Sequence, residues 1–483
     1  MDKVIEFYKE VQFTLGDSVL EIIYLLASIL FIYGLKMLSH PDTAKKGNLW
    51  AAAGMFIAIV STLFLHRYEG QGIHNIGLII AAIVLGTFTG WIIAKRVKMT
   101  EMPQLVSFFN GMGGAAAALI SLMEFPNIEP ELITKHGLFN WQALVIFLGL
   151  IIGSVSFAGS MMAYGKLAGK IKDIRKTYLR VINIILFLGT LGFMIFIMAQ
   201  GGTNLQDLYP YVIILFALSL IYGTLFVAPI GGADMPVVIS LLNSFTGVAA
   251  AMGGFLYNNL VMLTGGILVG SAGTILTILM CNAMNRSLFN VIIGAFSGEG
   301  GPDETDGSIK EVSITDAAVL LNYSPKVMII PGYGLAVAKA QMLMRELDQL
   351  LVENDVDVKY AIHPVAGRMP GHMNVLLAEA DVPYDKLLES EEANEQMENV
   401  DVAVVIGAND VVNPAAETDP SSPIAGMPII KAYNAKNIIV LKRGMGKGYA
   451  AIENSLFYHD KTRMLFGDAK ESLQNIVNEI KNL

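Results

Sequence analysis

The feature that most constrains this chain of 483 residues is a change of character near residue 290. Before that point the sequence is almost continuously apolar, and after it short apolar runs alternate with polar stretches. Long apolar runs predict membrane-spanning helices, whereas the alternating pattern predicts a soluble α/β fold. We therefore expect a transmembrane domain at 1–290, a flexible acidic linker at 291–318 and an α/β domain at 319–483.

Nine segments of the first half are apolar over the length of about 20 residues that a bilayer requires. They are residues 18–38, 48–65, 74–94, 104–123, 141–164, 179–199, 210–229, 235–256 and 259–281. A multi-span α-helical bundle is the prediction for this half. No small-residue cleavage pattern follows the first segment, so we expect it to be a permanent span.

Loop charges predict the orientation of these spans. Thirteen Lys and Arg residues lie in the loops that follow the odd-numbered segments, against 4 on the other side. Cytoplasmic loops are enriched in these two residues. The N-terminus is therefore expected outside, and the α/β domain in the cytoplasm.

Charge and cysteine content exclude several classes of function. Residues 291–483 hold 16 Lys and Arg against 28 Asp and Glu, whereas nucleic-acid-binding domains present a basic face. Cys281 is the single cysteine, which excludes an intrachain disulfide and a cysteine-based metal site. We expect neither a nucleic-acid partner nor a metal.

Polar residues within the predicted spans are candidates for function. Asn110 and Asn243 lie in the fourth and eighth segments, and Asp234 lies at the start of the eighth. Such residues either join helices by hydrogen bonds or line an ion path, and both interpretations stay open. No histidine lies deep in a predicted span, so a proton path would need another titrating group.

The second half predicts a doubly wound, Rossmann-like domain. Strands are expected at 326–331, 356–362, 401–407 and 437–442, with weaker candidates at 384–388 and 463–466. Helices are expected at 335–353, 373–380, 391–398 and 469–482. Strands that alternate with helices form a parallel sheet, and such sheets bind ligands at the carboxyl ends of their strands.

Gly332-Tyr333-Gly334 follows the first predicted strand and opens a predicted helix. Glycines permit a tight turn and the close approach of a pyrophosphate, whose charge a helix N-terminus favours. The third glycine of this fingerprint is replaced by Val337, and similar turns also occur without a ligand. The position between a strand and a helix favours a nucleotide site.

Other loops favour NADP(H) over NAD(H). The second strand runs into His363-Pro364, without the acid that usually bonds the ribose of NAD. Lys442 and Arg443 end a later strand, where two cations suit a 2′-phosphate, although a solvated basic pair is the alternative. Arg368 suits a pyrophosphate, and Asp410 places an acid at the same edge of the sheet.

Several segments together resemble the beta subunit of the proton-translocating nicotinamide nucleotide transhydrogenase over nearly the whole chain. The soluble segments are PGYGLAVAKAQ (331–341), HPVAGRMPGHMNVLLAEA (363–380), GANDVVNPAA (407–416), SPIAGMP (422–428), KRGMGKGYA (442–450) and LFGDAK (465–470). The membrane segments are GGADMPVVISLLNS (231–244) and CNAMNRS (281–287).

The resemblance implies a Re/Si-specific NAD(P)+ transhydrogenase of the plasma (inner) membrane. Its α/β domain would bind NADP(H), and its membrane domain would pass protons. Hydride would pass directly from NADH, held by an alpha subunit, to NADP+, so the chain would act only with that partner. The complete complex is expected to be a dimer, and inward proton movement would favour NADPH.

The resemblance also implies roles residue by residue. Asp410 would respond to protonation, and Lys442 and Arg443 would hold the 2′-phosphate. Residues of the proton path and its coupling would be Asn110, Asn243, Asp234 and Arg286. The nucleotide contacts would be Gly332, Tyr333, Gly334, Val365, Ala366, Gly367, Arg368, Met369, Pro370, Gly407, Ala408, Asn409, Asp410, Val411, Gly426, Met427, Lys442, Arg443, Gly444, Met445, Gly446, Lys447, Gly448, Tyr449, Asp468 and Ala469.

Two positions depart from the family pattern. Asn110 stands where some members carry a proton-path histidine, so the titrating group would lie on a companion subunit or water would carry the proton between asparagines. Gly444 stands where many members have Ser, which removes one hydroxyl contact to the phosphate.

A nucleotide-gated transporter or channel is the alternative from another class of protein, but no selectivity-filter sequence occurs. An NADPH oxidoreductase that feeds a haem or flavin would need pairs of histidines within spans. A purely structural membrane anchor would not need these loop motifs.

Overall fold

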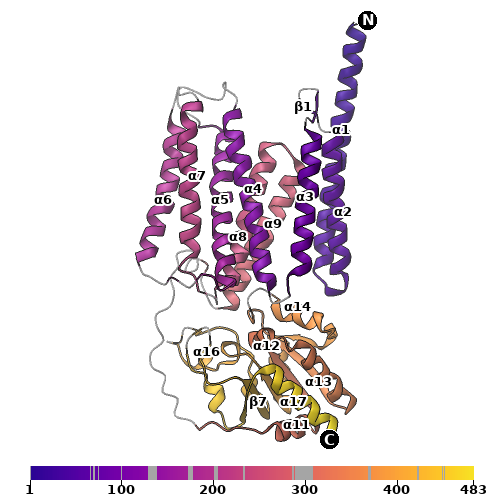
Figure 1. The fold of residues 1–483 in the computed structure, drawn as a ribbon, viewed down its shortest axis with the longest axis vertical. Helices are drawn as coiled ribbons and strands as arrows, with labels where there is room; N and C mark the ends of the chain where they lie inside the picture. Colours follow the sequence, from indigo (N-terminus) through magenta and orange to yellow (C-terminus); the bar gives the residue numbers. More distant parts are fainter. Residues whose placement is uncertain are drawn as a thin grey trace.

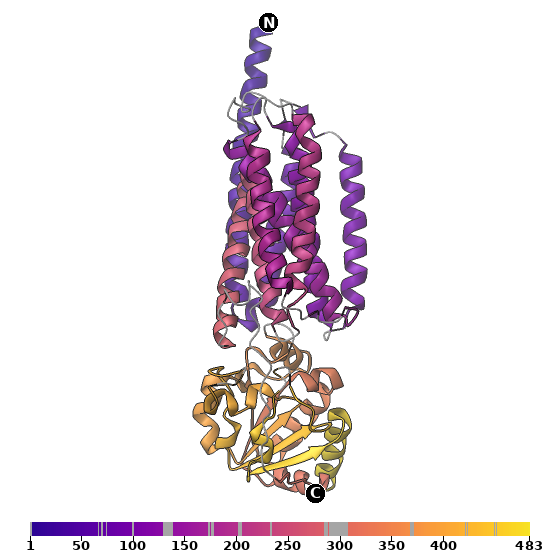
Figure 2. The same ribbon diagram turned by 90° about the vertical axis from the view of Figure 1, so that its left-hand side faces the viewer.

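The fold is described from a computed structural model. It describes residues 2–65, 67–68, 71–73, 75–98, 101–128, 139–171, 174, 178–200, 205–231, 234–284, 288, 308–367, 371–420, 422, 424–448, 450 and 452–483. Figures 1 and 2 show a helical bundle built from the first half of the chain and an α/β domain at one end of that bundle.

Within these residues, nine helices are long and apolar enough to cross a membrane. They are α1 (Asp2–Leu38), α2 (Pro41–Leu65), α3 (Ile76–Arg96), α4 (Met102–Glu124), α5 (Trp141–Leu167), α6 (Tyr178–Ala199), α7 (Leu205–Val227), α8 (Met235–Leu256) and α9 (Leu260–Ala283). The nine predicted spans are confirmed. A two-stranded hairpin, β1 (Arg67–Tyr68) and β2 (Gln71–Gly72), follows α2 and was not expected.

Glycines bring the central helices of the bundle into backbone contact. A Cβ added to Gly114 on α4 would lie 2.8 Å from the carbonyl oxygen of Gly153 on α5. Likewise, a Cβ on Gly247 of α8 would lie 2.4 Å from the backbone nitrogen of Gly270 on α9. Apolar surface gives no driving force between helices in lipid, so this close packing holds the bundle together.

Helix α3 differs from the others because none of its residues is buried. A Cβ added to Gly77, Gly86 or Gly90 would meet no atom within 4 Å. The chain as described therefore leaves every side of this span available to lipid or to another protein.

The second half forms a six-stranded parallel sheet, as predicted. Its strands are β3 (Lys326–Pro331), β4 (Asp357–Ile362), β5 (Leu387–Glu389), β6 (Val402–Ile406), β7 (Asn437–Lys442) and β8 (Thr462–Phe466). Their order in the sheet is β5-β4-β3-β6-β7-β8, and all pairs are parallel. The chain runs outward in one direction from β3 and in the other from β6, which is the doubly wound arrangement.

Helices and short turns cover the sheet. They are α11 (Ile314–Asn322), α12 (Tyr333–Ala338), α13 (Gln341–Glu353), α14 (His372–Glu379), α15 (Ser390–Gln396), α16 (Ala415–Thr418) and α17 (Ala469–Asn482), with 3₁₀ turns such as η4 (Tyr384–Lys386), η5 (Met397–Asn399), η6 (Asp410–Val412) and η8 (Ser455–Tyr458). Figure 1 places α13 and α17 side by side. Helix α11 begins inside the range predicted as linker and ends beyond it, and residues 308–318 are part of the described α/β fold, where Val312 N donates to Met464 O at 3.0 Å. The domain boundaries otherwise stay predictions.

Each strand buries alternate residues in two separate cores. Val327 and Ile329 pack with α11, α13 and α17 on one face. Met328 and Ile330 pack with α15, η5 and η8 on the other. Burial on both faces explains why the strands appear in the sequence as continuous apolar runs.

A buried ion pair joins α13 to η4. The carboxylate of Asp348 is fully buried, and its Oδ1 accepts a bond from Lys386 Nζ at 2.6 Å. Arg345 pairs with the other carboxylate oxygen. Glu346 on the same helix pairs with Lys481 at 2.6 Å, but both of these side chains are exposed.

We predict that these two carboxylates differ strongly in their effect on stability. Asp348→Ala leaves two cations without their buried partner and should lower the free energy of unfolding by about 3–5 kcal/mol. Glu346→Ala removes a solvated pair and should cost less than about 1 kcal/mol. Urea unfolding of residues 308–483, followed by circular dichroism, measures both. Equal losses for the two variants would contradict the assignment of Asp348 as the structural carboxylate.

Candidate functional site

The loops that follow β3 and β6 touch through their backbones at the point where the chain direction reverses. Gly332 N donates to Ile406 O at 2.8 Å, and Gly334 N donates to Gly407 O at 2.9 Å. A Cβ on Gly334 would lie 2.6 Å from the Cα of Gly407, and Gly407 itself has φ 65°. Side chains are therefore excluded where the two loops meet, at the carboxyl ends of the strands.

The helix after β3 is shorter than predicted. One helix was expected at 335–353, but α12 ends at Ala338, and Lys339 adopts φ 53° before α13 begins. Lys339 is an ordinary helix former, so the residue type at this position does not indicate the break.

A long loop after β7 lies over the loop after β6. Asp410 Oδ2 accepts a bond from Ala450 N at 3.0 Å. Asn454 Nδ2 donates to the backbone oxygen of Asn409 at 3.0 Å, and Asn413 Nδ2 donates to Glu453 O at 2.9 Å. Two side chains of the β6 loop, Asp410 and Asn413, and one of the β7 loop, Asn454, thus hold the two loops together. Sequence reasoning missed Asn413 and Asn454, whose partners lie 40 or more residues away in the chain.

The two predicted cations have different surroundings. Lys442 Nζ donates to Gly446 O at 2.6 Å and lies 4.4 Å from the ring centre of Phe457. Burial lowers the pKa of Lys442, and the nearby charge of Asp410 opposes that shift. Arg443 is exposed, and no hydrogen bond or ion pair joins it to a described residue. Of the two, Arg443 is the cation available to an anion.

His363 ties the loop after β4 to the segment before β7. Its Nε2 lies 2.7 Å from Pro428 O, and Val365 N donates to its Nδ1 at 3.3 Å. Burial lowers the pKa of His363 to about 4. The imidazole is therefore neutral near pH 7, with its proton on Nε2. The sequence singled out His363 only as the residue at the end of the second strand, where NAD-binding domains usually have an acid that bonds the ribose.

The remaining predicted contacts lie in loops at this same edge. Tyr333 stacks edge-on against His372, with ring centres 6.2 Å apart, and Gly367 at φ 111° lies against that histidine. Asp468 caps α17 by accepting a bond from Lys470 N at 3.0 Å, which is a structural role. The other described positions are Val365, Ala366, Ala408, Asn409, Val411, Gly426, Met427, Gly444, Met445, Gly446, Lys447, Gly448 and Ala469.

Five predicted site residues lie outside the described residues. They are Arg286, Arg368, Met369, Pro370 and Tyr449. Their assigned roles stay predictions.

In the bundle, Asn110 belongs to a cluster of hydroxyl groups at the contact of α4, α5 and α8. Its Nδ2 donates to Ser160 Oγ at 2.9 Å and to Ser156 Oγ at 3.5 Å. Ser156 also bonds Thr246 of α8, at 2.5 Å. Sequence reasoning missed these hydroxyl residues, although the spacing of four residues between Ser156 and Ser160 places both on one face of α5.

Asn243 does not join this cluster. It is exposed on the surface of the described chain, although it lies within α8. Asp234 is buried at the start of the same helix. Ala228 and Ile230 lie shortly before Asp234 in the sequence. Their carbonyl oxygens accept bonds from Lys166 Nζ of α5 at 2.6 Å and 2.8 Å, which fastens the end of α7 to α5.

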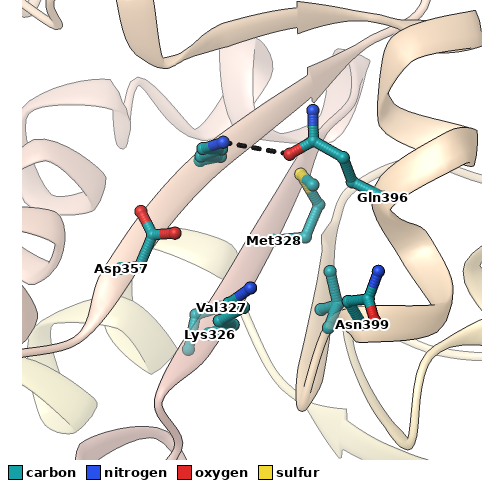
Figure 3. Close-up of a pocket in the computed structure, with 8 residues that line it drawn as sticks. Lys326, Val327, Met328, Asp357, Gln396 and Asn399 are labelled. Carbon is teal, nitrogen blue, oxygen red and sulfur yellow. Dashed lines mark hydrogen bonds between the residues drawn. The ribbon is translucent and has the colours of Figure 1, made fainter.

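A small hollow of about 70 Å³ lies at the opposite edge of the sheet (Figure 3). It is lined by Lys326, Val327, Met328, Asp357, Lys359, Gln396, Asn399 and Val400. Lys359 Nζ donates to Gln396 Oε1 there, at 2.9 Å. Doubly wound sheets bind ligands at the carboxyl ends of their strands, and this hollow is at the amino ends.

Comparison with known proteins identifies the family. A family model described as the NAD(P) transhydrogenase beta subunit matches residues 20–479. The chain belongs to this family. Two curated relatives, from Rhodospirillum rubrum and from a named strain of that species, carry the name NAD(P) transhydrogenase subunit beta. Each is 46% identical over 460 residues, which cover 94% of this chain and 97% of the relative.

Membership of the transhydrogenase beta subunits confirms the resemblance drawn from the loop motifs. It also fits the architecture, since a bundle of membrane helices carries a Rossmann-like domain on one polypeptide. The beta subunit of such an enzyme implies an alpha subunit as its partner.

We predict a pH dependence of stability that arises from His363. Its pKa is about 4 in the folded chain and about 6.5 when unfolded, so the unfolded state binds the extra proton between these values. The contribution of the neutral His363 to the free energy of unfolding is complete above pH 6.5. It is lost as the pH falls toward 4, by about 3 kcal/mol in all.

Urea unfolding of the wild type, His363→Gln and His459→Gln at several pH values measures this effect. Below pH 6.5 the free energy of unfolding of the His363→Gln variant should fall less steeply than that of the wild type. The exposed His459 serves as the control, and its variant should follow the wild type. Identical pH profiles for all three chains would rule out a neutral, buried His363.

Proposed function

We propose that this chain binds NADP(H) at the carboxyl edge of its sheet and couples hydride transfer to proton movement through its membrane domain. In the forward direction, hydride leaves NADH on the alpha subunit and reaches NADP+ here, so that NAD+ and NADPH form. Inward proton movement drives this direction. The observation that carries the proposal is the backbone contact of the glycine-containing loops at the β3–β6 switch point, together with the exposed Arg443 at the end of the neighbouring strand β7.

The residues present fit a phosphorylated dinucleotide. Because the two loops meet through Gly334 and Gly407, no side chain at these positions blocks the approach of a pyrophosphate. Arg443 offers a planar, permanently charged guanidinium to a 2′-phosphate. Lys442 contributes charge from within its loop, where its bond to Gly446 O shapes the loop around that phosphate. When bound, the nicotinamide supplies the hydride chemistry.

The loop at 442–450 is the element that would respond to the nucleotide. It is held to the β6 loop by the bond between Asp410 and Ala450, and the carboxylate also lies against Gly448. Protonation of Asp410 would replace a charge-assisted acceptor with a weaker one. In this way a proton at Asp410 would loosen the loop and lower the affinity for NADP(H).

The exposed parts of the bundle support a partner with membrane helices. Asn243 presents an amide on the outer surface of α8, and an amide in hydrocarbon is costly without a bonding partner. Every residue of α3 is at least partly exposed. Spans of the alpha subunit, or of a second copy of the complex, would cover these surfaces.

The cluster around Asn110 supports proton movement between α4, α5 and α8. Its side chains form a connected set of donors and acceptors, in which Asn110 joins Ser160 to Ser156 and Ser156 bonds Thr246. One charge that crosses 100 mV releases about 2.3 kcal/mol. That energy would shift a balanced hydride exchange about fifty-fold toward NADPH.

The nucleotide assignment predicts that Arg443→Ala weakens NADP+ binding. A charge-assisted bond of about 1.5–3 kcal/mol corresponds to a loss of about 10- to 150-fold, with little change for NAD+. Lys436→Ala is the control, because Lys436 is an exposed cation at the opposite edge of the sheet. Calorimetric titration of the purified chain measures both nucleotides. Preference for NAD+ in the wild type would overturn the assignment.

The proton assignment predicts that Asn110→Leu uncouples or blocks the enzyme. The wild-type chain and its alpha partner, reconstituted in vesicles, should move protons across the vesicle membrane as hydride is transferred, and the pH of the lumen should change. Asn110→Leu should lower both rates by about tenfold, since the cluster loses its central donor. Asn183→Leu removes an amide that bonds Leu225 O between α6 and α7, and it should be far milder. Equal rates in the two variants would contradict a path at Asn110.

A further inference from the structure

The cluster at Asn110 lacks a group that changes charge, because an amide does not titrate in the physiological range. Helix α4 carries one carboxylate at its far end, Glu124. This residue lies at the end of the bundle that the loop charges place outside. Figure 1 shows the α/β domain at the opposite end of the bundle.

Glu124 lies on the same seam between helices as Asn110. The two residues are 14 positions apart on α4, which at 100° per residue returns to within about 40° of the same direction. Tyr257 is the residue directly after α8 and lies 11 positions beyond Thr246, and 11 helical steps return to within about 20° of the same direction. The Asn110–Thr246 contact is therefore followed, about 17–21 Å farther along the seam, by a contact of Glu124 with Tyr257.

Small residues occupy the seam between these two polar contacts. The positions of α4 that share this face include Gly113 and Ala117, and those of α8 include Ala250. Gly113 already faces Thr246, since a Cβ placed on it would lie 3.0 Å from the Thr246 methyl carbon. Side chains of this size do not close the seam as Leu or Phe would.

Two neighbours hold the carboxylate in place. Tyr257 donates its hydroxyl to Glu124 Oε2 at 3.1 Å, and Asn127 Nδ2 donates to the same oxygen at 3.4 Å. Burial, followed by the charge of Glu124, raises the pKa of Tyr257 to about 12. The phenol therefore stays protonated and remains a donor throughout the physiological range.

We propose that Glu124 is the proton-accepting carboxylate at the outer mouth of the α4–α8 seam, and that Tyr257 is its positioning residue. This inference rests on the proposed function and supplies the titrating group that Asn110 cannot. In each cycle the Glu124 carboxylate takes one proton from bulk water and later gives the same proton to water in the seam. Only O–H bonds form and break, and no electrons are transferred.

Among the described residues, Tyr257 and Asn127 are the polar groups that contact Glu124. The neighbouring segment 129–138 lies outside the described residues. By sequence it contributes the charged and titratable side chains Glu129, Glu131, Lys135 and His136.

The test uses the full chain with its alpha partner in sealed vesicles that contain a pH-sensitive dye. Proton movement and hydride transfer are recorded together for the wild type, Glu124→Gln, Glu124→Asp and Tyr257→Phe. Asp207→Asn is the matched control, because Asp207 is an exposed carboxylate at the same end of the bundle, on α7. NADP+ titration of each variant reports whether the α/β domain is intact.

The inference expects Glu124→Gln to slow proton movement and the hydride transfer coupled to it by about tenfold or more. Tyr257→Phe should slow both by about two- to tenfold, and Glu124→Asp should recover most of the rate. Asp207→Asn and all NADP+ affinities should match the wild type. If Glu124→Gln fails to assemble, the intermediate loss in Tyr257→Phe decides the question.

Wild-type rates in both Glu124→Gln and Tyr257→Phe would overturn the inference while leaving the proposed function intact. A wild-type complex that transfers hydride without moving protons would instead overturn the proposed function. The two failures are therefore distinguishable in one set of vesicles.

Discussion

The backbone contact between the β3 and β6 loops is the constraint on which the rest of the soluble domain depends. Gly334 and Gly407 approach so closely that neither position admits a Cβ. This contact lies at the centre of the sheet, at the carboxyl ends of β3 and β6. The β7 loop is joined to the β6 loop through Asp410, and the β4 loop is joined to the segment before β7 through His363. These contacts involve the loops after β3, β4, β6 and β7.

Much of the architecture could be predicted because it depends on local composition. Spans follow from apolar length, and the strands at 326–331 and 437–442 match β3 and β7 as observed. The break at Lys339 could not be predicted, because Lys is an ordinary helix former. Helix α11 has a local signal that the linker prediction missed, since Ser313 and Asp316 have the spacing of a capping box before an apolar run. In the site, residue types and loops were predictable, but pairings such as His363 with Pro428 join residues 65 apart and depend on the tertiary fold.

The membrane half shows the same limit. Asn110 and Asn243 are alike in the sequence, each an amide within a span, and the sequence could not tell which of them faces the interior. The structure separates them, because Asn110 bonds Ser160 whereas Asn243 lies on the surface of the described chain. The difference arises from helix rotation, which close glycine contacts such as Gly114 with Gly153 determine.

Helix α5 has a mechanical consequence for communication between the two halves. Its Lys166 donates hydrogen bonds to carbonyl oxygens at the end of α7, beside the turn that leads to Asp234. Six residues earlier on α5, Ser160 accepts a hydrogen bond from Asn110. Six residues of rigid helix span about 9 Å. A displacement of the α7–α8 turn that moves Lys166 would therefore also move Ser160 and its partner Asn110, because one rigid helix joins the two contacts.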